Sequence, residues 1–318
     1  MDLLANLALG FEAALTLQNL GYATLGVVLG TAIGVLPGLG PVPTIAMLLP
    51  LTYALPPESA LIMLAGIFYG SQYGGSTTSI LVNIPGESSS VVTCLDGHQM
   101  ARKGQAGLAL ATAALGSFFA GCVATVLLAA FAPTLSAVAF KFGPAEYFSL
   151  MVLGLFGAVA LAHGSVLRAV SMILVGVLLG LVGTDITTGG QRFTLGFSEL
   201  FDGIEFVALA MGLFGLAEVI SNAGKKEERE LVTRKLEGLW PTPNDLKRMS
   251  MPAIRGTMLG SLLGLLPGGG ATLSSFAAYA LEKKVSKRSR EFGTGVLEGV
   301  AAPEAANNAA AQTSFIPM

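Results

Sequence analysis

The sequence predicts an all-α polytopic membrane protein with inverted repeats, re-entrant hairpins and broken helices, in which the second repeat is incomplete. Of its 318 residues, 53% are hydrophobic and 12% are charged, whereas a soluble domain has roughly 25% charged residues. Gly and Pro interrupt the apolar runs themselves, as they do in membrane helices. Lys and Arg are absent from the first 101 residues and crowd later segments. A net charge of -2 offers no basic face for nucleic acid.

A membrane helix needs about 20 apolar residues to cross the roughly 30 Å hydrocarbon layer. On this basis the chain divides into a first repeat over 1–221, a charged cytoplasmic loop over 222–255 and the start of a second repeat over 256–318. Residues 1–19 suit a helix that lies in the interface as well as one that inserts. The remaining predicted elements are a hairpin over 22–56, a broken helix over 58–84, helices over 106–132, 145–162, 166–183 and 203–221, a second hairpin over 256–281 and a partial broken helix over 295–318.

The basic residues orient these segments, because cytoplasmic loops carry an excess of Lys and Arg. With five crossings in the first repeat, the basic loops share one side, which we take as the cytoplasm. A single crossing over 256–281 would place the basic residues of 283–290 outside, and the break at 266–270 would lie in its centre. A re-entrant hairpin whose limbs are each about 16 Å long removes both conflicts.

Residues 22–40 and 254–270 are similar to each other at an offset of 230. Each copy contains three glycines at four-residue spacing, followed by Leu-Pro-Gly-x-Gly. Because an odd number of predicted crossings separates the copies, they enter the membrane from opposite sides, a construction common in secondary transporters. The glycine faces are expected to serve close helix packing.

The Leu-Pro-Gly-x-Gly tips are the first candidate ligand site. Pro lacks a backbone donor and Gly frees φ, so the tips expose backbone polar groups that hydrocarbon cannot satisfy. Two interpretations are open: these backbone groups line a ligand site, or the tips are purely structural bends. The candidates at the tips are Pro37, Gly38, Gly40, Pro267, Gly268, Gly269 and Gly270, with Thr272 beside the second tip.

A run of hydroxyl residues and glycines over 69–79 lies in the middle of the apolar segment 58–84. Such a run is typical of an unwound stretch that coordinates a small cation or donates to carboxylate oxygens. A Ser/Thr-rich helix contact is the alternative. Glu87, which follows, is either an ordinary loop carboxylate or part of a gate or ion site. The candidates in this region are Gly74, Gly75, Ser76, Thr77, Thr78 and Asn83.

The sequence contains no motif for covalent chemistry. A Ser/His/Asp set, a His-Glu-x-x-His zinc motif and a phosphate-binding Gly-Lys-Ser/Thr loop are all missing. Cys94 and Cys122 are far apart and lack metal-ligand spacing. We therefore expect no enzyme activity and no cofactor.

Five motifs occur in an order and spacing that resemble a known family. They are Gly-Val-Leu-Pro-Gly-Leu-Gly-Pro at 34–41, Tyr-Gly-Gly-Ser at 73–76, Asn-Ile-Pro-Gly-Glu at 83–87, Leu-Pro-Gly-Gly-Gly at 266–270 and Pro-Glu-Ala-Ala-Asn-Asn-Ala at 303–309. The chain thus resembles the large membrane subunit of the tripartite tricarboxylate transporters. The resemblance implies a permease that imports tricarboxylates or related carboxylates across the bacterial inner membrane, driven by a Na⁺ or H⁺ gradient. It implies two partners, a small membrane subunit and a periplasmic solute-binding protein.

The resemblance also adds Glu304, Asn307 and Asn308 to the predicted site and places a possible Na⁺ near Ser76, Thr77 and Asn307. From the residues alone, Glu304 is a membrane-embedded carboxylate, and such groups are functional by default because burying them is costly. Family members continue beyond Asn308 with a further break and helices, so we expect this chain to be truncated and inactive by itself. A non-transporting membrane scaffold or interaction subunit is the alternative function.

Overall fold

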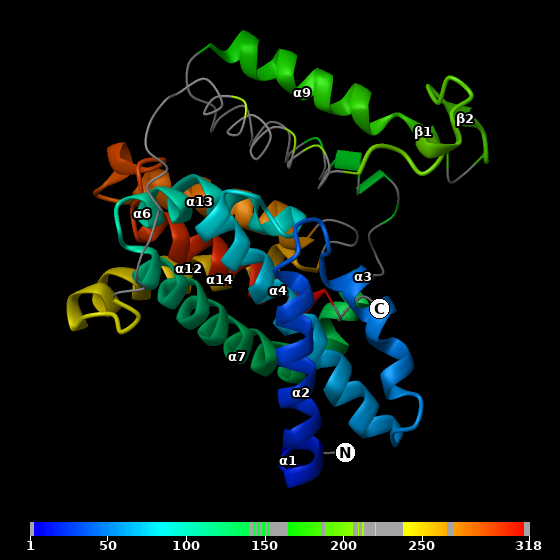
Figure 1. Ribbon diagram of the computed structural model, residues 1–318, viewed down its shortest axis with the longest axis vertical. Coiled ribbons are helices and arrows are strands. Elements are labelled where there is room, and N and C mark those ends of the chain that lie inside the picture. Colours follow the sequence, from blue (N-terminus) through cyan, green and yellow to red (C-terminus); the bar gives the residue numbers. More distant parts are fainter. Residues whose placement is uncertain are drawn as a thin grey trace.

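The computed structural model describes residues 3–139, 165–185, 188–205, 238–265 and 270–314, together with isolated residues between 143 and 152 and at 209, 212 and 220. This part of the chain is almost entirely helical, which confirms the all-α part of the prediction (Figure 1). A two-residue antiparallel ladder, β1 (Gly183–Thr184) with β2 (Gln191–Arg192), is the exception within it. The predicted helices over 145–162 and 203–221 lie largely outside the described residues, and so do Pro267, Gly268 and Gly269.

The first helices form a hairpin that packs along a long helix. α1 (Leu3–Ala14) and α2 (Leu17–Gly34) meet at 76°. α2 begins five residues before the predicted boundary, because the Thr16 hydroxyl caps it by accepting from the Asn19 amide at 3.2 Å. A tight turn then leads to α3 (Pro41–Leu48) and a 3₁₀ turn, η1 (Leu49–Thr52).

The helix that follows, α4 (Pro57–Val82), is continuous. The predicted break over 69–79 is therefore wrong, and the Ser/Thr-rich helix contact is the correct interpretation. Small residues in this stretch let α4 approach α2 closely, while Ser and Thr hydroxyls bond to carbonyls one turn earlier in the helix, as Ser79 does to Gly75 at 3.0 Å. α4 ends at Asn83, which adopts the left-handed conformation with φ 60°.

Short helical turns connect this hairpin unit to the next long helix. They are η2 (Ser88–Ser90), α5 (Val91–Thr93), the π-helical turn η3 (Cys94–His98) and α6 (Gln99–Arg102), and they lead into α7 (Ala106–Ala139). α9 (Val166–Gly180) is shorter than the predicted helix over 166–183, because the chain turns into β1 at Gly183. A 3₁₀ turn, η4 (Ser198–Leu200), follows β2.

The second hairpin begins earlier than predicted. α12 (Pro243–Leu263) starts inside the segment that was predicted as a charged loop, because Thr242 and Asp245 form a capping box there. α13 (Gly270–Val285), η6 (Ser289–Glu291) and α14 (Glu298–Thr313) follow. α14 is one continuous helix that contains Pro303, so the predicted broken helix over 295–318 is wrong for its described part.

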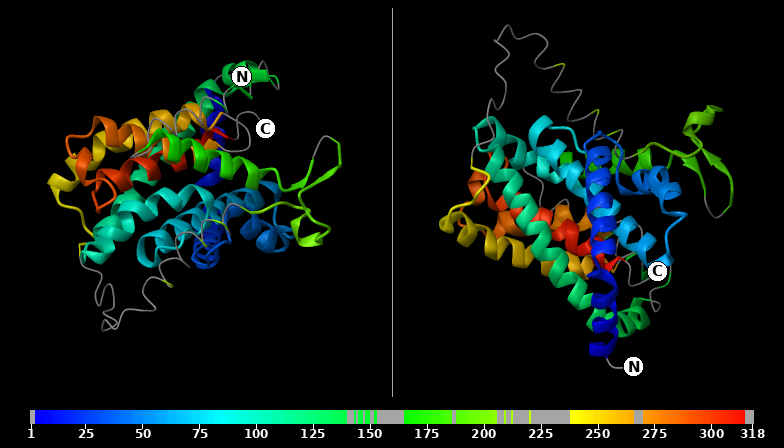
Figure 2. Two further views of the ribbon diagram at one scale, coloured as in Figure 1. Left: turned by 90° about the horizontal axis from the view of Figure 1, so that it is seen from above. Right: turned by 60° about the horizontal axis from the view of Figure 1, so that its bottom comes forward.

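Glycines bring the helices of each unit together, as predicted. Gly26, Gly30 and Gly34 of α2 lie directly against the α4 backbone, and a Cβ on Gly30 would come within 2.8 Å of Ile67 Cα. Gly256, Gly260 and Gly264 of α12 lie in the same way against α14. The two helices, yellow to orange and red, run side by side (Figure 2). α14 also packs on α7 and α13, so it is the central helix of the described bundle. The opposite membrane orientation of the two units stays a prediction.

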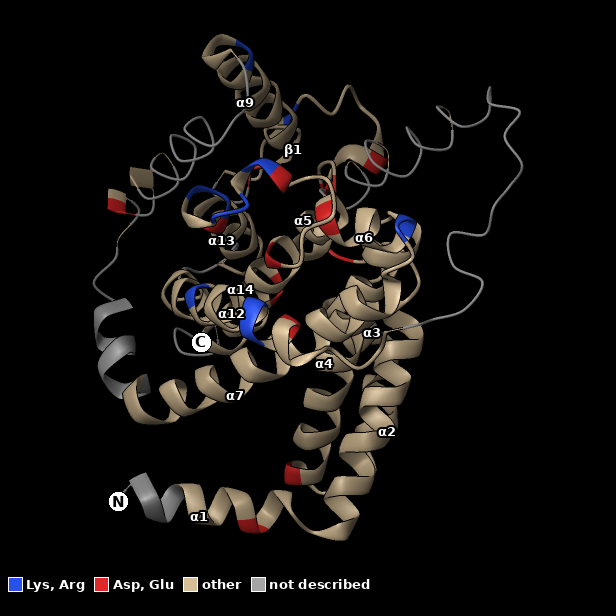
Figure 3. Cartoon of the chain, turned by 90° about the vertical axis from the view of Figure 1, so that its left-hand side faces the viewer, with Lys and Arg blue, Asp and Glu red and all other residues tan. Residues whose placement is uncertain are grey.

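Basic residues and exposed apolar helices lie in different parts of the molecule. Lys and Arg gather around α6, α12 and α13, whereas α1 and α2 carry none (Figure 3). Among the described residues, one helix segment, Ala106–Phe131, is long and apolar enough to cross a membrane alone, and the bent pair α1–α2 is a second candidate span. Exposed Leu, Val and Phe side chains on α2, α7 and α9 suit contact with lipid.

Candidate functional site

Two helices, α4 of the first hairpin unit (α1 to α4) and α14 of the second hairpin unit (α12 to α14), present polar side chains toward one another inside the bundle. On α4, Gln72 and Ser76 are four residues apart and thus share one helix face. On α14, Glu304 and Asn307 are three residues apart and share a face in the same way. All four side chains are buried, so α4 and α14 enclose a polar cluster within otherwise apolar surroundings.

The carboxylate of Glu304 is held entirely by hydroxyl groups. One oxygen accepts from Thr93 of α5, and the other accepts from Ser76 at 2.9 Å and from Ser117 of α7 at 3.4 Å. Only 1% of Glu304 is exposed. The side chain therefore ties three other helices to α14 through neutral donors.

A second buried carboxylate, Glu87, lies next to this group. It accepts from Ser89 at 2.8 Å and from the Asn307 amide nitrogen at 3.2 Å. The Asn307 amide oxygen in turn accepts from the Gln72 amide nitrogen at 3.0 Å. Asn307 is thus the link between the loop that carries Glu87 and the polar face of α4.

The cluster holds two carboxylates and no cationic side chain. The ion pairs among the described residues are Arg192–Asp185, Arg248–Glu298, Arg255–Glu282 and Arg288–Glu291, and none involves Glu87 or Glu304. A buried carboxylate without a counter-charge costs several kcal/mol in apolar surroundings. Hydroxyl and amide donors reduce that cost but leave the negative charge in place, so the arrangement favours a bound proton or small cation.

An open acceptor lies in the same cluster. The Gln72 amide oxygen is buried and has no hydrogen-bond partner. Buried polar atoms almost always have a partner, so this unpaired oxygen, on a side chain that donates to Asn307, is available as a ligand for a hard cation such as Na⁺. Among the described residues there is no group of three or more His, Cys, Asp or Glu side chains of the kind that holds a transition metal.

The structure brings several of the predicted site residues to this cluster. Ser76, Glu304 and Asn307 belong to it directly, and Asn308 donates to Ser117 at 2.6 Å. A Cβ on Gly40 or on Gly75 would lie 3.4 Å from the Glu87 side chain, so these glycines line the cluster.

Other predicted residues lie elsewhere. Gly74 packs against the C-terminal end of α2, and the Thr78 hydroxyl donates to Val35 and to Gly74. The Thr77 hydroxyl donates to the carbonyl of Tyr73 on its own helix. The remaining residues take structural positions. Pro37 is exposed at the tip after α2, and Gly38 adopts φ 85° there. Asn83 caps the end of α4, Gly270 begins α13, and the Thr272 hydroxyl hydrogen-bonds to the Ser88 hydroxyl at 2.8 Å.

Sequence reasoning missed four members of the cluster, Gln72, Ser89, Thr93 and Ser117. Gln72 had a readable signal, since a Gln four residues before Ser76 in an apolar helix shares its face. Ser89 and Thr93 lie in short turns, and Ser117 is a single hydroxyl in an apolar helix. Nothing in their sequence context distinguishes them from ordinary helix residues.

Asp96 fixes the end of α14 that leads to the site. This fully buried carboxylate accepts from the backbone amides of Gly293, Gly295 and Val296 at 2.7–3.0 Å and from the Tyr279 hydroxyl at 2.8 Å. It lies in η3, whereas its donors lie in α13 and in the connection between α13 and α14. Asp96 thus joins the two units and sets the position of α14.

This architecture defines a helical membrane protein with a buried polar site between two hairpin units, as in secondary transporters. The model of the tripartite tricarboxylate transporter TctA family matches residues 20–318, and the chain belongs to this family. The resemblance drawn from the five motifs is therefore confirmed. The family is one of membrane transport proteins and not of enzymes.

Two curated proteins of Agrobacterium vitis are similar to the chain. The first, described as an uncharacterized 52.8 kDa protein in the TAR-I ttuC' 3'region, is 62% identical over all 318 residues, which cover 63% of its length. The second, an uncharacterized protein in the TAR-II ttuC' 3'region, is 70% identical over 59 residues, which are 19% of this chain and 24% of that protein. No solved structure matches the chain.

Proposed function

We propose that the chain is part of the permease subunit of a secondary active transporter that imports tricarboxylates or related carboxylates across the bacterial inner membrane. Transport is coupled to a Na⁺ or H⁺ gradient. A periplasmic solute-binding protein delivers the substrate, and a small membrane subunit completes the complex. Family membership supports the transporter class, and the buried cluster supports coupling to a cation.

The observation that carries the proposal is the pair of buried carboxylates, Glu87 and Glu304, held by neutral donors alone. A purely structural cluster would be more stable with a Lys or Arg nearby, or with apolar side chains in place of the acids. A site that must bind and release a cation needs negative charge without a permanent counter-charge. Ser76 and Asn307 supply further oxygen atoms there. Thr77 is omitted from this cation site because its hydroxyl bonds to its own helix.

The substrate anion is assigned to the nearby hairpin tips. The N-terminus of α3 begins after Gly40, beside Glu87, and that of α13 begins at Gly270. Backbone amides at a helix N-terminus carry a partial positive charge and bind carboxylates. The first turn of α13 supplies such amides. At α3, Pro41 and Pro43 have no N–H and the Thr44 amide donates to Gly40, so Val42 is the amide donor of that turn. A cation bound at Glu87 and Glu304 would lower the repulsion that these acids exert on an incoming carboxylate. This arrangement couples the binding of the two ligands.

The experiment is uptake of labelled citrate and other carboxylates into proteoliposomes that contain the full-length permease with its small subunit and solute-binding protein. Na⁺ and pH gradients are imposed separately. We expect uptake only with a gradient and with the solute-binding protein, and loss of uptake on Glu304→Gln. Absence of uptake across a broad carboxylate panel would instead favour the alternative function, a membrane scaffold or interaction subunit.

A further inference from the structure

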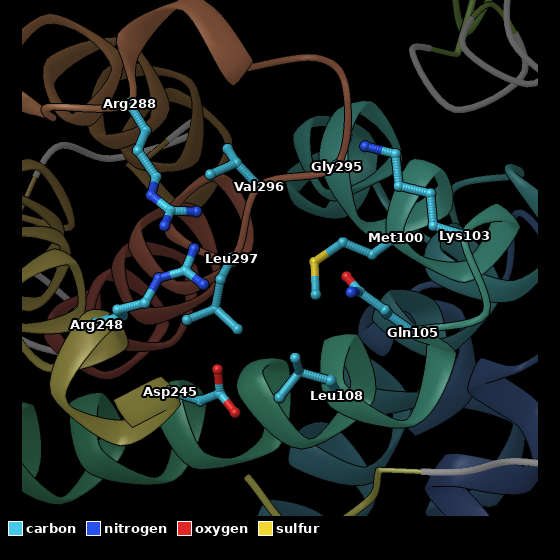
Figure 4. A pocket seen from close by; sticks show the side chains of 10 residues that line it. All are labelled: Met100, Lys103, Gln105, Leu108, Asp245, Arg248, Arg288, Gly295, Val296 and Leu297. Atoms are coloured by element: carbon cyan, nitrogen blue, oxygen red, sulfur yellow. The ribbon is translucent and has the colours of Figure 1, made fainter. Parts of the chain in front are cut away.

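A cavity of about 220 Å³ opens at the end of the bundle where Lys and Arg gather, away from the buried cluster. Three parts of the chain form it: α6 with the start of α7, the first turns of α12, and the connection between α13 and α14 (Figure 4). Its walls are the side chains of Met100, Lys103, Gln105, Leu108, Asp245, Arg248, Arg288, Val296 and Leu297, with the backbone of Gly295.

Cationic groups converge on this cavity from different elements. The guanidinium groups of Arg248 and Arg288 extend toward each other on one side, and Lys103 lies on the opposite side (Figure 4). Asp245 is the single acid in the lining, so the lining has a formal charge of +2. Its carboxylate is engaged with Thr242, which donates from its amide at 3.0 Å and from its hydroxyl at 2.6 Å.

The three cationic side chains differ in how strongly each is already paired with an acidic side chain. Arg248 donates to both oxygens of Glu298 at 3.0 Å, which raises the pKa of the guanidinium and keeps it charged. Arg288 has a longer contact of 3.6 Å with Glu291, and both side chains are about half exposed. Lys103 is exposed and takes part in no ion pair found among the described residues. Charge on Lys103 and Arg288 is therefore available for a ligand.

Residues near the cavity suit a position at a membrane surface. Trp240, the one Trp in the sequence, is 91% exposed just before α12, and Trp is enriched where headgroups meet hydrocarbon. Farther along α12, the exposed side chains of Met251, Met258 and Leu262 share one face of the helix. The cavity thus lies near an exposed Trp and before the apolar face of α12, a setting that suits a site at the headgroup level.

We propose that this cavity binds the phosphate group of an anionic phospholipid, held by Lys103 and Arg288 with Arg248 behind them. Arg and Lys are the usual phosphate ligands, and basic pockets between helices bind anionic headgroups. Met100, Leu108 and Leu297 supply the apolar part of the wall, against which the glycerol backbone packs. The volume suits a headgroup, since sites for whole drug-sized ligands occupy about 300–1,000 Å³.

The test is native mass spectrometry of the full chain in detergent, titrated with phosphatidylglycerol, with phosphatidylcholine or with inorganic phosphate. Wild-type protein is expected to bind phosphatidylglycerol at least about tenfold more tightly than phosphatidylcholine. Equal binding of the two lipids overturns the proposal. Displacement of the lipid by an equal concentration of inorganic phosphate overturns its assignment to lipid and makes the site one for soluble phosphate.

A pair of matched variants locates the binding. The double variant Lys103→Gln with Arg288→Gln removes one Lys and one Arg from the cavity, and Lys284→Gln with Arg290→Gln removes the same charges from exposed positions outside it. We expect about a tenfold loss of phosphatidylglycerol affinity in the first variant and little change in the second. Equal losses in both, or none in the first, overturn the assignment. The wild-type lipid comparison requires no variant and is independent of transport.

Discussion

The hydroxyl of Ser76 on α4 donates a 2.9 Å hydrogen bond to the carboxylate of Glu304 on α14, 228 residues further along the chain. The bond joins the two hairpin units at the centre of the bundle. The same carboxylate also accepts from α5 and α7. A change in the charge state of Glu304 would therefore act on four helices together.

Glu304→Gln should weaken coupling to the cation while preserving the fold. The amide keeps the size of the side chain and one acceptor but loses the negative charge, and an interaction of the cation with a charged ligand is worth about 1.5–3 kcal/mol. This corresponds to about a 10- to 100-fold loss in cation affinity. Uptake by the complete transporter, measured against Na⁺ concentration and pH, tests this. Glu291→Gln, at an exposed position, is the control, and unchanged cation dependence in Glu304→Gln would argue against the site.

Gly260→Ala should destabilise the contact between α12 and α14. A Cβ at Gly260 would lie 2.7 Å from Ala306 Cα and closer still to the Ala306 carbonyl oxygen, so the helices must separate. We expect a loss of about 1–3 kcal/mol in the free energy of unfolding. Gly121→Ala is the matched control, because nothing lies within 4 Å of a Cβ there. Thermal unfolding in detergent that shows equal stability for both variants would contradict this packing.

Asp96→Asn should loosen the connection that positions α14. The substitution removes the charge that three backbone amides and the Tyr279 hydroxyl share. The expected loss in stability is about 1–3 kcal/mol. Hydrogen exchange at Gly293, Gly295 and Val296 should accelerate, whereas Asp202→Asn, at an exposed position, should leave it unchanged. Full protection in Asp96→Asn would show that the amides do not depend on this carboxylate.

Arg255→Gln should cost more than a typical surface ion pair. Arg255 donates two 2.7 Å hydrogen bonds to Glu282, which is 1% exposed and would be left as a buried, unpaired charge. Because the guanidinium is 36% exposed, we expect about 1–3 kcal/mol, below the roughly 3–5 kcal/mol of a fully buried pair. The double variant with Glu282→Gln should recover part of this loss in thermal unfolding. Additive effects of the two single substitutions would show that the pair is not coupled.

The helix boundaries show where sequence reasoning reached its limit. The charged stretch before residue 256 suggested a loop, yet Pro243 and the Thr242–Asp245 capping box begin α12 there. The hydroxyl-rich run of α4 suggested unwinding, yet each Ser and Thr hydroxyl in it bonds within the helix or to a neighbouring element. Local composition does not reveal whether a polar residue in an apolar helix breaks it or faces a polar partner.

The sequence by itself determined the helical membrane class, the two similar glycine faces of α2 and α12, and the family, because these depend on composition and on local spacing. It also pointed to Ser76, Glu304 and Asn307. Only the tertiary structure decided that these residues meet Gln72, Glu87, Thr93 and Ser117 in one buried cluster without a cationic side chain. The physical reason is that the partners come from separate helices, whose relative positions depend on packing at glycines and on the hydrogen bonds of Asp96, and those contacts leave no local pattern in the chain.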